Sequence, residues 1–317
     1  MKHLTKVADL SLSEVEDILD TAIRFRDLHA RGIRRENILD GRVVAMVFEK
    51  PSLRTKVAFE VAAAYLGAVP VFLSSSQILA SGQNEKGRES IPDIGRNLER
   101  FCDLIIARVY SHETIRQLAS VVRCPVINAL CDKHHPTQAL ADLMAIKLHK
   151  GLSKDLKVSF LGDGNNVATS LMQICALTGL NFSIASPEGY EIPATEQEVG
   201  RALSKTHGTK LEFLNSPAEA LRGADVVYTD TFVSMGQENE RLSRAEAFSE
   251  YQVNINLMKK AKPDAVFMHC LPAHRGEEVT DEVMDSPQSI VFDEAECRLH
   301  IAKALLLKLL SPQKSGE

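Results

Sequence analysis

The chain has 317 residues, of which 44% are hydrophobic and 25% charged, with a formal net charge of -5 and a pI near 6.1. This composition is typical of a globular protein of two domains of about 150 residues each, and the acidic balance provides no basic surface for nucleic acid or anionic lipid. No apolar run approaches the ~20 residues of a bilayer span, and residues 1–4 lead into a polar helix rather than a signal peptide, so we expect a cytoplasmic enzyme that binds neither nucleic acid nor membrane.

Six cysteines occur in the chain, without any Cys-x-x-Cys pair. Most of them lie in apolar periodic segments, so we expect neither a disulfide framework nor a zinc site. Five are expected to be buried packing residues. Cys270 is set apart because it follows an apolar strand-like run and precedes a Leu-Pro pair.

The first predicted element is an amphipathic helix that begins near Ser11. Ser11 and Ser13 precede Glu14 and Glu16, which is the arrangement of a capping box at a helix start. Apolar residues follow at helical spacing, at Val15, Ile18, Leu19, Ala22 and Ile23. We expect this helix to pack and to carry no chemistry.

Apolar strand-like runs then alternate with helical patterns as far as residue 150. The predicted strands are 43–48, 69–73, 104–109 and 125–130, and the predicted helices lie near 55–66, 91–101, 112–121 and 137–149. Such alternation is typical of a parallel sheet with right-handed crossovers. We therefore expect a first domain over residues 1–150.

A second domain is expected over residues 151–293, after a glycine-led hinge at 151–155. Its predicted strands are 157–161, 181–185, 210–213, 225–229 and 265–268, with helices near 166–178, 194–206 and 217–222. A strongly apolar helix over 294–310 lies in the last segment, 294–317. The predicted fold class is α/β, with two domains that each contain a mostly parallel sheet flanked by helices.

The segment after the first strand has the features of a phosphate site. Ser52-Leu53-Arg54-Thr55 joins a strand to a helix, so backbone N–H groups, two hydroxyls and a guanidinium meet at a helix N-terminus. The helix dipole and these donors favour an oxyanion. An ordinary helix cap with a surface arginine is the alternative.

Polar residues also follow the third and fourth predicted strands. Arg108 would bring a second cation to the same carboxyl edge of the sheet. His135 and Gln138 lie before the next helix, where a His donor and a Gln amide can hold the carbonyl oxygen and the NH2 group of a carbamoyl unit. A structural histidine and a surface arginine are the alternatives.

Residues 160–167 resemble the start of a dinucleotide-binding fingerprint. Val167 stands at the place of the third glycine, and no acidic residue ends the next strand, so the dehydrogenase interpretation weakens. Asn166, at the start of the following helix, is expected to bind a small polar ligand, with helix capping as the alternative.

Two more polar segments follow strands of the second half. Asp230, Ser234 and Met235 come after the strand 225–229, where a carboxylate can hold an ammonium group. Cys270 follows the strand 265–268, and a thiol near cations can ionise because cations lower its pKa. The alternatives are a buried structural thiol for Cys270 and, for Arg298 in the closing helix, an ordinary surface residue.

Taken together, the order and spacing of these segments resemble the carbamoyltransferase family over essentially the whole chain. The ornithine branch is indicated by Gly-Asp-Gly-Asn-Asn at 162–166, by Ser-Met-Gly at 234–236 and by His-Cys-Leu-Pro at 269–272. An aspartate carbamoyltransferase is expected to carry a Pro-Leu-based motif in place of the cysteine. The resemblance implies an N-terminal carbamoyl-phosphate domain, a C-terminal ornithine domain, and a final helix that packs back on the first domain.

The resemblance also implies the residues of each site. Carbamoyl phosphate would be bound by Ser52, Leu53 through its backbone N–H, Arg54, Thr55, Arg108, His135, Gln138, the backbone around Cys270 and Leu271, and Arg298. The α-amino and carboxylate end of ornithine would be bound by Asn166, Asp230, Ser234 and Met235. The implied catalytic residues are Cys270, beside the δ-amine, with Arg108, His135 and Arg298.

The implied reaction is attack of the neutral δ-amine of L-ornithine on the carbamoyl carbon, which gives L-citrulline and phosphate in arginine metabolism. Thr55, Arg108 and His135 would hold the developing oxyanion, and the phosphate would leave already neutralised by the helix terminus and the arginines. Because the protein then only positions groups and stabilises charge, no metal or organic cofactor is expected.

A homotrimer with active sites shared between subunits is the implied assembly. In the family, a loop that corresponds to residues 74–89 here reaches the neighbouring active site, and in this chain it is several residues longer than usual. Gln77, Gln83 and Lys86 are the candidates for that contact.

The chain departs from the family pattern at a few positions. Leu53 stands where Thr is common and Lys56 where Arg is common, and both can leave backbone contacts with phosphate intact. Phe232 and Cys297 replace a more usual Trp and Asn, which makes an acylated ornithine or a related amine an alternative substrate. Asp230 favours a free α-amino group, because acylation removes the charge that it would pair with.

A non-catalytic binding protein on the same scaffold is the other alternative, because a fold does not fix a function. The presence of Arg54, His135, Cys270 and Arg298 argues against it.

Overall fold

The computed structural model describes residues 1–74, 89–233 and 238–311. The chain divides into two compact units, one made of Met1–Leu140 and Glu296–Glu317 and the other of Ala141–Ala295. The divisions fall inside helices α6 (Pro136–Lys150) and α13 (Val291–Leu310). The expected ligand of each domain remains a prediction.

The first unit contains a four-stranded parallel sheet with the order β2-β1-β3-β4. Its strands are β1 (Val43–Phe48), β2 (Val69–Ser74), β3 (Leu104–Arg108) and β4 (Val126–Leu130). Its other elements are η1 (Val7–Asp9), α1 (Leu12–Ala30), α2 (Leu53–Leu66), α4 (Ile91–Leu98) and α5 (His112–Val121). These strands and helices confirm the predicted alternation.

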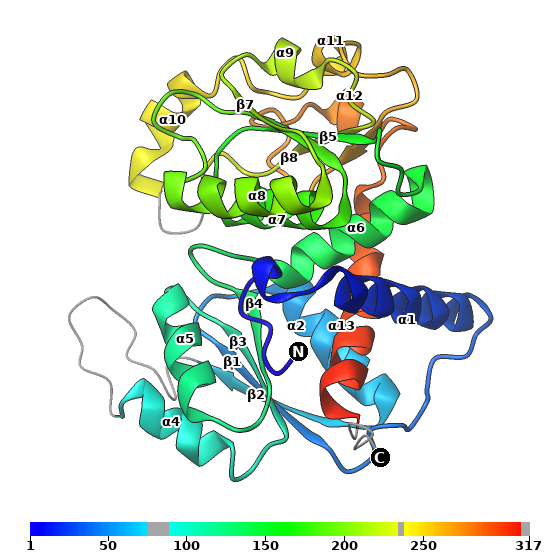
Figure 1. Ribbon diagram of the computed structural model, residues 1–317, viewed down its shortest axis with the longest axis vertical. Coiled ribbons are helices and arrows are strands. Elements are labelled where there is room, and N and C mark those ends of the chain that lie inside the picture. Colours follow the sequence, from blue (N-terminus) through cyan, green and yellow to red (C-terminus); the bar gives the residue numbers. More distant parts are fainter. Residues whose placement is uncertain (75–88, 234–237, 312–317) are drawn as a thin grey trace. The chain divides into compact units, whose positions relative to one another are not determined.

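Both faces of this sheet are covered, which is why the inner strands are apolar along their whole length. Ala45 and Val47 on β1, with Ile105 and Ala107 on β3, form a buried cluster with residues of α4 and α5. Figure 1 shows α4 and α5 on one side of the sheet and α2 and α13 on the other. The last fifteen residues of α13 belong to this unit, as expected for a closing helix that packs back on it.

The opening helix α1 begins as predicted. Ser11 Oγ accepts a hydrogen bond from the Glu14 backbone N–H at 3.2 Å, and the Glu14 carboxylate accepts from the Ser11 N–H at 2.9 Å. This reciprocal pair is the capping box that the sequence indicates.

The second unit contains a five-stranded parallel sheet with the order β7-β6-β5-β8-β9. Its strands are β5 (Lys157–Leu161), β6 (Asn181–Ala185), β7 (Leu211–Leu214), β8 (Val226–Thr229) and β9 (Val266–Met268). Its helices are α7 (Asn166–Thr178), α8 (Ala194–His207), α9 (Pro217–Leu221), η2 (Glu238–Glu240), α10 (Arg241–Ala247), α11 (Ile255–Met258) and α12 (Asp281–Met284).

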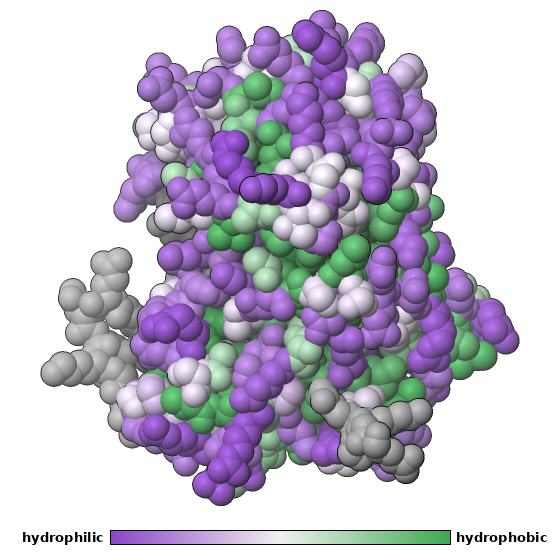
Figure 2. All heavy atoms as spheres, viewed as in Figure 1, coloured by the Kyte–Doolittle hydropathy of each residue, from purple (hydrophilic) through white to green (hydrophobic). Residues whose placement is uncertain are grey.

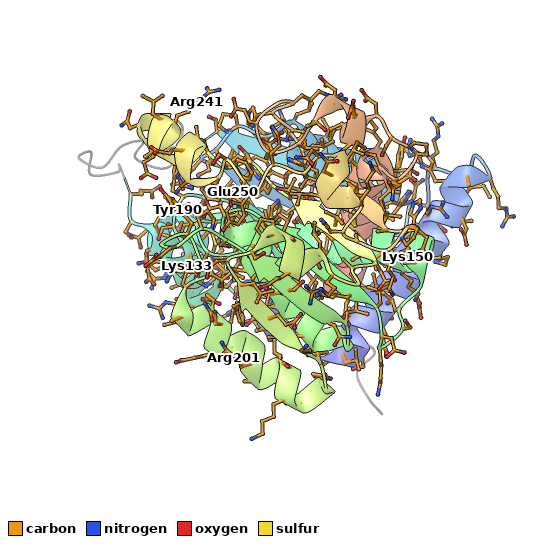
Figure 3. The ribbon with its side chains drawn as sticks, turned by 90° about the horizontal axis from the view of Figure 1, so that it is seen from above. Lys133, Lys150, Tyr190, Arg201, Arg241 and Glu250 are labelled. Atoms are coloured by element: carbon orange, nitrogen blue, oxygen red, sulfur yellow. The ribbon has the colours of Figure 1, made fainter. Side chains whose placement is uncertain are left out.

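Helices cover this sheet on both faces as well. Figure 1 shows α7 and α8 on one face and α9, α11 and α12 on the other. Residues 167–177 of α7 are all buried, whereas Gly200 is the one buried residue of α8, whose Arg201 lies on its outer side in Figure 3. α7 is thus the inner helix of that layer.

On the face seen in Figure 2, hydrophilic residues cover most of the surface and apolar residues form smaller areas between them. Within the described ranges, no helix combines the length and the apolar character needed to cross a membrane.

Candidate active site

The sheet orders bring the predicted site residues of each unit to neighbouring strand ends. In the first unit β1, β3 and β4 are adjacent, and they lead to Ser52, Arg108 and His135 respectively. In the second unit β5, β8 and β9 are adjacent, and they lead to 162–166, Asp230 and Cys270. Ligands of open parallel sheets bind at such carboxyl edges, next to the point where the strand order reverses. Each unit therefore contains one candidate cluster.

The first cluster begins at the N-terminus of α2. Ser52 is the residue that caps this helix, since its Oγ accepts from the backbone N–H of Thr55 at 3.3 Å. The side chain of Leu53 is exposed, Arg54 is partly buried and Thr55 is buried. The first turn of a helix and the positive end of its dipole favour an anion, here beside Ser52.

Two arginines meet at the hydroxyl of Thr55. Arg298, on α13, donates from Nη2 to Thr55 Oγ1, and Arg108 Nη1 lies 3.5 Å from the same oxygen. Arg108 and Arg298 are only 6% and 8% exposed. Two guanidinium groups so close together in a poorly solvated place repel each other, and a bound anion relieves that repulsion.

His135 lies beside these cations and is buried. Its Nδ1 is 3.3 Å from Thr137 Oγ1, and its carbonyl accepts from the backbone N–H of Gln138 at 3.1 Å. Burial, followed by the positive charges of Arg298 and Arg108, lowers the pKa of His135 well below 6.5. The imidazole is therefore neutral near pH 7, with one nitrogen able to donate a hydrogen bond and the other able to accept one.

Lys50 is a further cation of this region that the sequence interpretation left without a role. Its Nζ lies 4.6 Å from the ring centroid of Tyr110, and burial and Arg108 lower its pKa. The neighbouring Glu49 accepts from the Tyr110 backbone N–H at 2.5 Å, and burial raises its pKa. Its position just before Pro51-Ser52 is a signal that could have pointed to Lys50.

The second cluster is centred on Asp230, which is 7% exposed. Its Oδ2 accepts from Asn165 Nδ2 at 2.9 Å, and its Oδ1 accepts from the thiol of Cys270 at 3.1 Å. Asp230 thus joins the loop after β5 to the loop after β9. These three groups form the polar end of a site that suits an ammonium group.

The second unit does not provide the cations that would let Cys270 ionise. Burial raises the pKa of the Cys270 thiol well above its usual range, and the carboxyl groups of Asp230 and Glu294 act in the same direction. The sequence placed cations in the same site, but the nearest charged side chain in the second unit is a carboxylate. Cys270 is therefore a neutral thiol that donates to Asp230, and its catalytic role remains a prediction.

Asn165, not Asn166, caps helix α7. Asn165 Oδ1 accepts from the backbone N–H groups of Val167 and Ala168 at 2.9 and 3.1 Å, while its Nδ2 donates to Asp230. Asn166 is the first helical residue and is partly buried, so the capping alternative for it is wrong. An Asn directly before a helix is a start signal, and this signal could have identified Asn165.

The glycines before this helix serve packing. A Cβ on Gly164 would lie 2.1 Å from the backbone nitrogen of Ile192, and the Gly164 N–H donates to the Tyr190 carbonyl at 2.7 Å. The chain at 190–192 therefore occupies the space beside the glycine. This close approach further weakens the dehydrogenase interpretation.

Arg244, on α10, is a buried residue that sequence reasoning missed. Its Nη1 donates at 3.0 Å both to Asp163 Oδ2 and to the carbonyl of Phe232, and its guanidinium lies 4.9 Å from the ring centroid of Tyr190. Figure 3 labels Tyr190 and Arg241, the first residue of α10. Burial raises the pKa of Asp163 to about 6, although Arg244 opposes this shift. Arg244 thus connects the loop after β5, at Asp163, with the chain just after Asp230, at Phe232.

The backbone at 270–272 is unusual. Leu271 has a φ of 58°, and its peptide bond to Pro272 is cis. The Leu271 N–H donates to His269 Nδ1 at 2.9 Å, so this nitrogen carries no proton and Nε2 bears the hydrogen that faces Glu278 at 3.2 Å. Asp230, His269 and Cys270 are close enough to be metal ligands, but both ring nitrogens of His269 are engaged in these hydrogen bonds.

Some predicted residues lie outside the described part of the chain. These are Ser234 and Met235 of the expected ornithine site, and Gln77, Gln83 and Lys86 of the expected intersubunit loop.

Two sequence profiles of one family match the chain. The carbamoyl-P binding domain of aspartate/ornithine carbamoyltransferase matches residues 2–148, and the Asp/Orn binding domain of the same family matches residues 154–309.

The relatives are similar along their whole length. The ornithine carbamoyltransferase of Pyrococcus furiosus that is named anabolic is 46% identical over 305 residues, which cover 96% of this chain and 95% of the relative. The enzyme of Thermoplasma acidophilum named catabolic is 44% identical over 311 residues, which cover 98% of this chain and 99% of the relative. The solved structure of the ornithine carbamoyltransferase from P. furiosus matches with a TM-score of 0.93 at 44% identity, over 99% of this chain and 98% of that chain.

Proposed function

This chain belongs to the aspartate/ornithine carbamoyltransferase family, and from this premise we propose that it transfers the carbamoyl group of carbamoyl phosphate to the δ-amine of L-ornithine. The products are L-citrulline and phosphate. The observation that carries the choice of ornithine is the second cluster, in which a buried Asp230 accepts from Asn165 and from Cys270. A carboxylate in that place suits the free α-ammonium group of a diamino acid.

Carbamoyl phosphate is assigned to the first unit. Ser52, the N–H groups of Leu53 and Arg54, and the side chains of Arg54 and Thr55 would bind the phosphate at the start of α2. The convergence of Arg108 and Arg298 on Thr55 supports this role, since the leaving phosphate and the tetrahedral oxyanion are both negatively charged.

The carbamoyl group itself is assigned, in the first unit, to His135 and Gln138. A neutral His135 can donate one hydrogen bond to the carbonyl oxygen without adding a third positive charge beside the two arginines. The Gln138 amide would accept from the carbamoyl NH2 group. Such hydrogen bonds orient the carbamoyl carbon for attack.

Ornithine is assigned to the second unit. Asn166, Asp230 and, outside the described residues, Ser234 and Met235 would bind its α-amino and carboxylate groups. Cys270 would lie against the δ-amine. Because the thiol keeps its proton, we assign it a hydrogen-bonding and packing role and not that of a base.

We propose that the enzyme works in arginine biosynthesis, because the P. furiosus relative is named anabolic. The T. acidophilum relative is named catabolic, and catabolism is therefore the alternative. A strain that lacks the gene decides between them: a requirement for arginine would support biosynthesis, and loss of growth on arginine as a nutrient would support the catabolic alternative. We propose the cytoplasm as the location, where both substrates would be available to the enzyme.

A homotrimer with shared sites is proposed as the working form. Apolar side chains are exposed on α2, at Leu53 and Val57, and on the edge strand β2, at Val69, Val71 and Phe72. Lys56 Nζ lies 3.9 Å from the Phe72 ring centroid, which joins the two elements into one surface. An exposed apolar edge strand is a hazard unless a partner covers it, and a second copy of this chain is the partner that family membership favours.

The test of the proposed substrate is a panel of amines with carbamoyl phosphate held saturating. L-Ornithine is expected to give citrulline and phosphate in equal amounts, while Nα-acetyl-L-ornithine, L-lysine and L-aspartate are expected to give little of either. Preference for the acetylated amine would refute the role assigned to Asp230.

A further inference from the structure

Three buried polar side chains lie behind the loop of Cys270, and the reaction described above uses none of them. They are Asp142 on α6, Tyr228 on β8 and Glu294 on α13, and all three are completely inaccessible to solvent. All belong to the second unit. Buried carboxyl groups are costly and are seldom retained without a specific role.

The three groups form one hydrogen-bonded cluster. The Tyr228 hydroxyl lies 3.1 Å from Glu294 Oε1 and 3.4 Å from Asp142 Oδ1. The Tyr228 ring is itself stacked on Phe160 of β5, at 5.5 Å between centroids and 19° between planes. The cluster is therefore fixed to the centre of the sheet.

Glu294 connects this cluster to the loop. Its Oε2 accepts from the backbone N–H of His269 at 3.0 Å, at the residue directly after β9. Tyr228 is paired in register with Met268, so the hydroxyl and the His269 N–H come from neighbouring strand ends. Glu294 is placed to receive a hydrogen bond from each.

The protonation state of Glu294 agrees with a structural role as a hydrogen-bond acceptor. Burial and the neighbouring Asp142 carboxyl hold the pKa of Glu294 well above its usual range. The acid pair therefore keeps a proton near pH 7 and avoids two buried negative charges side by side.

The loop is held at two successive points. Glu294 fixes the N–H of His269, and the His269 ring accepts the N–H of Leu271 at 2.9 Å, so that Cys270 lies between two fixed amides. The thiol of Cys270 then meets Asp230 at 3.1 Å. A loop that lost its first anchor would no longer hold the thiol and the adjoining backbone in place.

We propose that Glu294, supported by Asp142 and Tyr228, is a positioning residue that fixes the 269–271 loop for the transfer reaction. The inference rests on the proposed function for its effect on turnover, but the position of the loop can be tested without substrate. Glu294 acts through the His269 amide and does not itself contact a substrate.

The test compares three variants of the full chain. Glu294→Leu removes the acceptor at similar volume, and Glu294→Gln keeps a carbonyl oxygen that can accept from the His269 N–H. Asp293→Asn is the matched control: Asp293 pairs with His149 at 2.9 Å and so also links α13 to α6, but on an exposed side. Steady-state kinetics and the alkylation rate of Cys270 by iodoacetamide, resolved by peptide mass spectrometry without substrates, are measured for each.

In Glu294→Leu, kcat is expected to fall by up to about a hundredfold, the loss that a displacement of about 1 Å can cause, and Cys270 is expected to react faster. Glu294→Gln and Asp293→Asn should remain close to the unaltered protein in both measurements. A purely structural role would lower the melting temperature without changing the alkylation rate in folded Glu294→Leu.

Unchanged kcat and alkylation in folded Glu294→Leu would overturn the proposal, as would equal damage in Glu294→Gln. If Glu294→Leu does not fold, amide hydrogen exchange in the unaltered protein decides, because the proposal requires slow exchange at His269 and rapid exchange there refutes it. If the unaltered protein makes no citrulline, the proposed function fails, while alkylation and hydrogen exchange still test the anchoring of the loop.

Discussion

Replacing Asp230 by Asn should selectively impair the use of ornithine. The carboxylate accepts two hydrogen bonds, from Asn165 at 2.9 Å and from the Cys270 thiol at 3.1 Å. An Asn side chain offers a single acceptor oxygen, so one of these donors loses its partner. The substituted residue also lacks the negative charge assigned to the α-ammonium group of the substrate.

The expected magnitude follows from that lost charge. A hydrogen bond to a charged group contributes about 1.5 to 3 kcal/mol, and each 1.4 kcal/mol corresponds to about a tenfold change. We therefore expect kcat/KM for ornithine to fall by roughly ten- to 150-fold, measured as citrulline formation. The KM for carbamoyl phosphate should change by less than about twofold, because its assigned donors lie in the first unit.

A second readout concerns Cys270. The Asp230 carboxylate helps to raise the pKa of the thiol, so its removal should lower that pKa and increase the thiolate fraction at a given pH. Iodoacetamide should then modify Cys270 faster in Asp230→Asn.

The matched control is Asp225→Asn, because Asp225 directly precedes strand β8 and Asp230 directly follows it. Asp225 is also buried and accepts from the Lys157 backbone N–H at 2.9 Å and from Lys262 Nζ at 2.7 Å. This variant is expected to lose stability and to keep its kcat/KM for ornithine. Wild-type kcat/KM for ornithine in Asp230→Asn would refute the assigned role of Asp230.

Four further predictions concern other parts of the account. Arg54→Ala should weaken carbamoyl phosphate binding by about 1.5 to 3 kcal/mol with little change in melting temperature, and wild-type saturation by carbamoyl phosphate would exclude Arg54 from the phosphate site. Cys270→Ala should reduce turnover more than Cys270→Ser, because serine keeps a donor for Asp230; a lower melting temperature with unchanged kinetics in both would leave Cys270 a packing role only. Because the pKa of His135 is lowered in the folded protein, below about pH 6.5 the unfolded chain binds a proton that the folded chain does not, and the free energy of unfolding decreases as the pH decreases. In urea titrations between about pH 7 and pH 5, His135→Gln should therefore lose less stability than the unaltered protein. Parallel pH dependences of the two proteins would contradict this. Phe72→Asp should dissociate the proposed trimer in sedimentation experiments, and a trimer of undiminished stability would remove α2 and β2 from the interface.

The alternation of elements could be predicted because each has a strong local signal. Strands β1, β5 and β6 and helices α5 and α7 have the predicted bounds. The two helices begin directly after capping residues, Ser111 and Asn165. The short helices α10, α11 and α12 were missed. They contain four to seven residues and so show too little periodicity to identify a face.

The edge of each sheet that carries the polar loops was also predictable, because parallel strands present their carboxyl ends together. Contacts between distant residues have no local signal, and only the family resemblance placed Arg298 in the same site as Thr55. Arg298 reaches Thr55 across 243 positions, and only the packing of α13 brings them together. The direction of the Cys270 pKa shift has no local signal either, because a sequence does not tell which of several charged residues is the nearest neighbour.

The central claim is that this chain joins the carbamoyl carbon to the δ-nitrogen of ornithine. The most direct test follows carbamoyl phosphate labelled with ¹³C at the carbamoyl carbon, mixed with L-ornithine and the purified protein, by NMR and by phosphate release. We expect the label to appear on the δ-nitrogen, as citrulline, in one-to-one proportion with phosphate and only when both substrates are present. Phosphate release that is independent of ornithine, or label on the α-nitrogen, would contradict the claim.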